Sequence, residues 1–146
     1  MSGLAIALDL DGVLADTRAL WDAWLEDAAR RARVELDVPA DREAAALVLD
    51  RALGDWRPLL TRFAADRAPL WIRPRPDTNA ALRRLAAAGA RIGVFSDAPR
   101  ELVEIALAHA GAARQVEIVG TLADVEAALG GEAVVVRSRE ELAGLR

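Results

Sequence analysis

The chain has 146 residues, a formal net charge of −4 and no cysteine. This length suits one compact α/β domain with a small insertion, and the lack of cysteine excludes disulfides, thiolate metal sites and thiol redox chemistry. The mild acidic excess argues against a nucleic-acid partner, which usually requires a basic stripe. The apolar N-terminal run carries no basic leader and is too short for a signal peptide or a membrane span, so we expect a cytoplasmic protein without a membrane partner.

The first half of the chain predicts one strand followed by helices. Leu4 to Leu10 is a continuous apolar run, which is typical of a parallel strand covered on both faces. From Asp16 to about Arg67 the apolar residues recur at helical spacing, with breaks near Pro39 and Gly54. This pattern indicates a small helical insertion after the first strand.

The second half alternates predicted helices and strands, which is the order of a mainly parallel sheet. The predicted segments are helix 77–88, strand 92–95, helix 99–110, strand 116–119, helix 122–129 and strand 133–136. The expected fold class is therefore α/β, with a Rossmann-like parallel sheet core. We assign residues 1–15 and 73–146 to this core and residues 16–72 to the helical insertion.

Two carboxylates follow the first strand, in the sequence Asp9-Leu10-Asp11-Gly12. They share a face if the strand stays extended, and their repulsion is relieved if a divalent cation such as Mg²⁺ binds between them. One carboxylate can then attack phosphorus while the other handles the proton. The alternative is a tight acidic turn at Asp11-Gly12 without chemistry.

Ser96 and Asp97 follow the predicted strand 92–95. Ligands of parallel sheets bind beyond the carboxyl ends of the strands, so both residues are expected at the same edge as Asp9 and Asp11. Taken alone, Ser96 is an ordinary turn residue, and Asp97 more simply holds the adjacent loop by a hydrogen bond than ligates a metal.

Two segments resemble motifs of the haloacid dehalogenase superfamily. Residues 7–17 (ALDLDGVLADT) resemble its first motif and residues 91–97 (RIGVFSD) its second. By this resemblance the insertion is the cap, Asp9 is the nucleophile that becomes aspartyl-phosphate, and Asp11 protonates the leaving group and then activates water. Ser96 would hold the phosphoryl oxygens, with Gly12 and Asp97 as neighbours in the phosphate site. Family members that cleave carbon–halogen bonds lack an acid at the place of Asp11, so the resemblance favours phosphoryl transfer.

The last third departs from the family pattern, whose basic third motif and acidic fourth motif are not clearly present. Residues 118–128 resemble the fourth motif with one acid deleted, which makes Asp124 a metal ligand beside Asp9 and Asp11. The competing interpretation of Asp124 is a helix cap. All 19 basic residues are Arg, and Arg114 is the nearest candidate for the phosphate-binding basic residue, although a solvated loop charge is the simpler reading.

A second alignment makes residues 133–136 the fourth strand of the family pattern and offers Glu140 or Glu141 as the metal acid. We rank it second, because its crossover would span several strands with a helix of two turns, whereas a short connection suits adjacent strands.

These observations predict a Mg²⁺-dependent phosphatase that acts on a small phosphorylated metabolite. The first alternative is a catalytically degenerate relative that binds a phosphorylated ligand or a protein partner. The second alternative is a phosphomutase.

Overall fold

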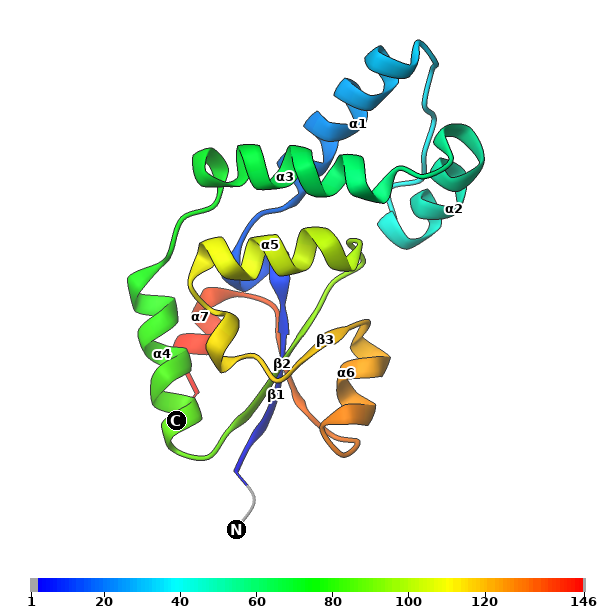
Figure 1. Cartoon of the computed structure of the whole chain (residues 1–146). Coiled ribbons are helices and arrows are strands. Elements are labelled where there is room, and N and C mark those ends of the chain that lie inside the picture. The colour runs from blue at the N-terminus through cyan, green and yellow to red at the C-terminus, as the bar shows by residue number, and fades with distance from the viewer. Residues whose placement is uncertain (1–2, 146) are drawn as a thin grey trace.

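The computed structural model describes residues 3–145 and shows a parallel sheet of four strands in the order β3-β2-β1-β4. The strands are β1 (Ala5–Asp9), β2 (Arg91–Phe95), β3 (Ile118–Gly120) and β4 (Val134–Val136). They run side by side through the centre of the molecule (Figure 1). The α/β class and the parallel sheet predicted from the sequence are confirmed.

The apolar run of β1 is explained by its central place between β2 and β4. Ile6 and Leu8 face the larger cluster of buried side chains, and Ala7 faces a smaller cluster on the opposite side of the sheet. All three side chains are fully buried. A strand covered on both faces needs apolar residues at successive positions rather than at alternate ones.

Helices cover both faces of this sheet. On one face lie α4 (Pro76–Ala87), α5 (Arg100–Ala110) and the short α7 (Arg139–Ala143), whose apolar residues join the larger cluster. On the other face lies α6 (Leu122–Ala128), which supplies Val125 to the smaller cluster (Figure 1). Helix α5 ends at Gly111, whose φ of 74° is left-handed, and a 3₁₀ turn at Ala113–Gln115 leads into β3.

The helical insertion contains α1 (Arg18–Ala32), α2 (Arg42–Leu53) and α3 (Arg57–Trp71), which lie beyond the carboxyl ends of the strands (Figure 1). Trp21, Trp24 and Trp56 are buried against one another, with ring centroids 5.4 to 6.3 Å apart, and form its core. Helix α3 continues through Pro69. Pro69 lies in the last turn, so its missing N–H removes only one helical hydrogen bond.

The connection from β3 to β4 corrects the preferred sequence alignment. It crosses β2 and β1 to reach the opposite edge, so the strand order is that of the second alignment. Three strand spacings are about 14 Å, whereas the seven residues of α6 rise about 10 Å, and residues 129–133, which turn at Gly130 and Gly131, lead from the helix into β4. Because α6 packs against β3, β2 and β1 in turn, two helical turns are long enough.

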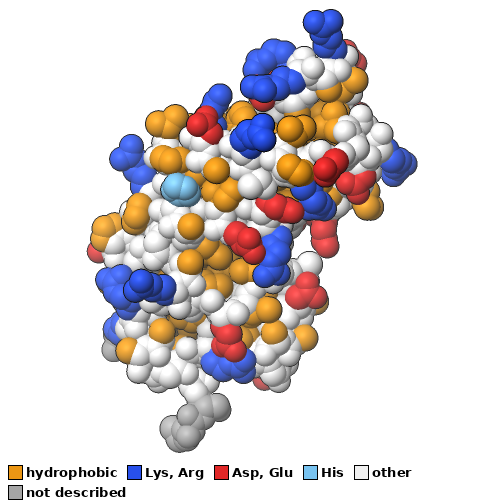
Figure 2. All heavy atoms as spheres, viewed as in Figure 1, with side chains coloured by type: hydrophobic (Ala, Val, Ile, Leu, Met, Phe, Trp, Pro, Cys, Tyr) orange, Lys and Arg blue, Asp and Glu red, His pale blue; other side chains and the backbone are white. Residues whose placement is uncertain are grey.

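On the face shown in Figure 2, acidic and basic side chains are interspersed rather than segregated. None of the helices within residues 3–145 combines the length and apolar character needed to cross a bilayer.

Candidate active site

A single π-helical turn, η1 (Leu10–Leu14), carries the acidic motif away from β1. The N–H of Ala15 donates to the carbonyl of Leu10 at 3.0 Å and closes this turn. Gly12 is required here, because a Cβ atom at this position would lie 2.1 Å from the carbonyl oxygen of Arg137. Single π turns are frequent at functional sites, since they redirect side chains at the end of a regular element.

Asp9 ends β1 and lies half-buried beneath this turn. Burial and the negative charge of Asp11 raise the pKa of Asp9, while hydrogen bonds from the backbone N–H groups of Gly12 and Asp11 and the positive charge of Arg137 oppose the rise. The backbone amide of Gly12, which the sequence assigned to phosphate binding, thus points at the carboxylate of Asp9.

The raised pKa of Asp9 predicts that Asp9→Asn stabilises the protein at neutral pH. Ionising Asp9 costs more in the folded than in the unfolded state, so wild-type stability falls as pH rises through the folded pKa, whereas Asn carries no charge. Urea unfolding should give a stability difference in favour of Asp9→Asn that grows from pH 3.5 to pH 7. The exposed Asp37→Asn is the matched control, and a difference independent of pH would contradict the prediction.

Asp11 is held by residues of the insertion. Its Oδ1 accepts hydrogen bonds from the backbone N–H and the hydroxyl of Thr17, at 2.7 and 2.6 Å, and its Oδ2 accepts from the guanidinium of Arg42 at 2.5 Å. Arg42 also donates to the hydroxyl oxygen of Thr17 at 2.7 Å, and both side chains are fully buried. Both oxygens of Asp11 are therefore occupied in this arrangement.

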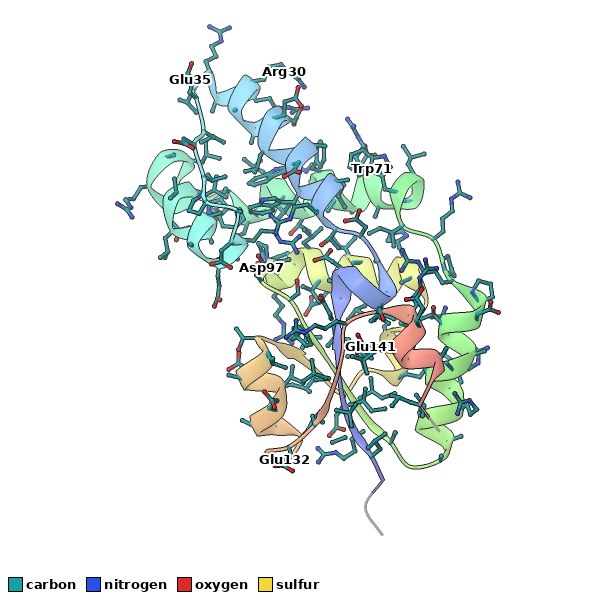
Figure 3. The ribbon with its side chains drawn as sticks, turned by 180° about the vertical axis from the view of Figure 1, so that it is seen from behind. Arg30, Glu35, Trp71, Asp97, Glu132 and Glu141 are labelled. Atoms are coloured by element: carbon teal, nitrogen blue, oxygen red, sulfur yellow. The ribbon has the colours of Figure 1, made fainter. Side chains whose placement is uncertain are left out.

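Asp97 forms an ion pair with the same guanidinium group of Arg42. Its carboxylate accepts hydrogen bonds from the backbone N–H and the Nε of Arg42, both at 2.9 Å, and from Arg18 at 3.4 Å. Burial alone would raise the pKa of Asp97, but the hydrogen bonds and charge of Arg42, helped by the charge of Arg18, lower it. Figure 3 shows Asp97 where α2 meets the core.

Arg42 is the site residue that the sequence analysis missed. The helical pattern placed it in the insertion without a role, and its partners lie 31 and 55 positions away in the chain. One local signal was present: Arg42 opens α2, directly after the capping residue Asp41, where the helix dipole disfavours a cation. A buried cation at this position indicates a compensating pair of acids.

Ser96 follows Phe95, the register partner of Asp9, so it lies at the same sheet edge. Its Oγ accepts the N–H of Ala98 at 3.0 Å, as a turn residue does, and the hydroxyl proton remains available for a ligand. Ser96 and Asp97 line a cavity of about 140 Å³ at the ends of β2 and β3.

Asp124 shares that cavity, but its carboxylate accepts the N–H of Thr121 at 3.2 Å in a capping box at the start of α6. Arg114 lies before β3, at the amino end of the strands and so at the opposite end of the sheet from Asp9. Glu141, from the second alignment, accepts the backbone N–H of Arg137 at 3.4 Å on α7 (Figure 3). The structure brings none of these three side chains to Asp9.

The side chains present do not fit a magnesium site. Asp11 and Asp97 are engaged by Arg42, Asp124 caps α6, and within residues 3–145 no three acidic or histidine side chains converge to hold a metal ion. The residue that follows β4 next to Asp9 is the cation Arg137, which repels a divalent ion.

Comparisons with known proteins agree with the fold. The family of haloacid dehalogenase-like hydrolases matches residues 4–133, whereas no curated protein sequence matches the chain. A putative β-phosphoglucomutase from Thermotoga maritima superposes with a TM-score of 0.55 at 16% identity, over 90% of this chain and 74% of that one. L-2-haloacid dehalogenase from Xanthobacter autotrophicus, with chloropropionic acid covalently bound, superposes with a TM-score of 0.52 at 18% identity, over 91% and 68%.

At these identities the two structures establish the fold alone, and the family match covers most of the chain but stops before β4. It includes the strand and turn that carry Asp9 and Asp11 and the strand that delivers Ser96. The chain therefore belongs to the haloacid dehalogenase-like hydrolases and is an enzyme of that type.

Proposed function

We propose that the protein is a phosphatase that transfers the phosphoryl group of a small phosphorylated metabolite to Asp9 and then to water. The observation that carries the proposal is the pairing of two acids, Asp9 and Asp11, at the carboxyl end of the central strand, with the buried cation Arg42 of the insertion bound to Asp11. A nucleophile, a proton carrier and an anion-binding group are thus within one site.

The chemistry needs two steps. An oxygen of Asp9 attacks phosphorus, and the bond to the leaving oxygen breaks as Asp11 gives that oxygen a proton. Asp11, now ionised, then takes a proton from a water molecule whose oxygen attacks the acyl phosphate. Phosphate leaves, Asp9 is regenerated as a carboxylate, and Asp11 is protonated again.

The contacts of Asp11 set a condition for this cycle. Both of its oxygens accept hydrogen bonds in the arrangement described, so Asp11 is turned toward Thr17 and Arg42 and reaches a leaving group only after Arg42 moves away. Arg42 is fully buried, so an anionic substrate competes with Asp11 for its guanidinium once the insertion moves, because arginine pairs with phosphate oxygens as it does with carboxylates. Substrate binding thus releases Asp11 for proton transfer.

The alternative is a relative that binds a phosphorylated ligand or a protein partner without turnover. It is favoured by the same observation that Asp11 is fully engaged, and by the lack of an acid directly after β4, where Arg137 stands. The Mg²⁺ dependence predicted from the sequence stays a prediction, and the assay below measures it in parallel.

The test is phosphate release from a panel of small phosphomonoesters, measured with Mg²⁺ and with EDTA. Mass spectrometry of acid-quenched protein should show one added phosphoryl group on the peptide that contains Asp9 during turnover. Halide release from 2-halo acids serves as the comparison reaction. Phosphate at background for the whole panel, with no modified peptide, would reject the phosphatase and leave the binding protein.

A further inference from the structure

Arg137 lies beside the nucleophile and takes no part in the steps above. It directly follows Val136, whose register partner on β1 is Leu8, so its own neighbour is Asp9. On the other side of β1, Asp9 pairs with Phe95. Phe95, Asp9 and Arg137 therefore form one row across the ends of three strands, and parallel register places their side chains on the same face.

The guanidinium of Arg137 reaches across this row. Its Cζ atom lies 5.3 Å from the ring centroid of Phe95, two strands away. Two strand spacings are about 10 Å, so the side chain can approach the ring only by passing over the end of β1, where Asp9 lies. The contact with the aromatic face is a cation–π interaction and fixes the direction of the side chain.

The backbone of Arg137 is fixed as well. Its carbonyl oxygen packs against Gly12 in the turn that carries the acidic motif, and its N–H donates to Glu141 at 3.4 Å. The side chain is exposed, and its guanidinium forms no ion pair with any carboxylate in the described part of the chain. It is thus an oriented, solvent-accessible cation next to Asp9.

The charges around Asp9 indicate the role of Arg137. The site contains three carboxylates and three guanidinium groups: Asp9, Asp11, Asp97, Arg18, Arg42 and Arg137. Arg42 and Arg18 pair with the second and third acids, which leaves Asp9 to be balanced by Arg137 alone. A phosphate dianion would be repelled by an unbalanced carboxylate, whereas here the positive charge of Arg137 offsets the negative charge of Asp9 while its N–H donors remain free for phosphate oxygens.

We propose that Arg137 is a substrate-binding residue whose guanidinium holds the phosphoryl oxygens against Asp9, and that it supplies the positive charge a divalent ion would otherwise bring. The proposal rests on the proposed function for the role of Asp9 as nucleophile. The site then binds phosphate without any metal, through paired N–H donors whose planar geometry matches two phosphoryl oxygens.

The test is direct binding of inorganic phosphate, measured by isothermal titration calorimetry in EDTA. Wild-type protein is expected to bind, and added Mg²⁺ is expected to leave the affinity unchanged. Arg137→Gln should weaken binding at least about 10-fold, because it removes a charged hydrogen-bond donor. Arg114→Gln removes the same charge at the other end of the sheet and should bind like wild type; circular dichroism checks that both variants are folded.

The outcomes separate this inference from the phosphatase. Phosphate binding that requires Mg²⁺, or an equal affinity of Arg137→Gln and wild type, overturns the role of Arg137 even where phosphoesters are hydrolysed. Binding that depends on Arg137 without turnover of any phosphoester supports the anion site and rejects the phosphatase alone. A second variant, Arg137→Asp, should abolish phosphate binding in EDTA, and retained binding would contradict the proposal.

Discussion

Asp9→Asn is expected to lower the rate of phosphate release at least about 1,000-fold, because an amide cannot attack phosphorus and no second side chain takes over the nucleophile's role. The loss should appear in kcat, since the residues that hold the phosphoryl group are unchanged. The measurement is the steady-state rate with the best phosphomonoester of the panel. The modified peptide expected for the wild type should be absent.

Two controls make this result interpretable. Inorganic phosphate should still bind to Asp9→Asn, because Arg137 and Arg42 remain and one negative charge has gone. Asp124→Asn changes a carboxyl that caps α6, outside the proposed reaction, and should keep most of the activity. Turnover retained by Asp9→Asn would exclude a covalent mechanism at this residue, whatever the fate of the other variants.

The local patterns of the sequence predicted the elements well. The apolar run before Asp9 predicted β1, and the helical pattern that stops at Gly111 predicted α5. Both signals depend on interactions between residues that are close in the chain. Both the period of apolar residues and the capping residues act within one or two turns. Such signals are available without knowledge of the tertiary structure.

The strand order could not be predicted from such local patterns. Whether β4 joins the edge at β3 or the edge at β1 depends on how α6 crosses the sheet, and the length of the connection permits both. This single choice decides which residue stands beside Asp9. With β4 next to β1 that residue is Arg137. The site therefore contains a cation where the sequence predicted acids around a metal ion.

The role of Arg42 could not be predicted either, because it depends on tertiary contacts. Its contacts with Asp11 and Asp97 join the insertion to the core across long stretches of chain, and no periodicity reports such a pair. The sequence did place both acids at the correct sheet edge. What it lacked was the identity of their partner, which is set by the packing of α2 against the ends of the strands.

Arg42→Met is expected to destabilise the protein by about 3 kcal/mol at pH 7, which is the low end of the cost of breaking a buried ion pair. Arg42 is fully buried, but Asp11 and Asp97 are each 29% exposed, so water relieves part of the charge left behind. Urea unfolding measures the change, with the exposed Arg51→Gln on the same helix as the control. In a double-mutant cycle, the effects of Arg42→Met and Asp97→Asn should fall short of additivity.

The pH dependence gives this prediction its sharpest form. The pKa of Asp97 is lowered in the folded state, so its contribution to stability is present above the unfolded value of about 3.9 and is lost as pH falls through the folded pKa. The penalty of Arg42→Met should therefore shrink as the solution is acidified below about pH 4. A penalty that stays constant down to pH 3 would mean that Arg42 stabilises the junction by packing rather than by charge, and that neither acid depends on it.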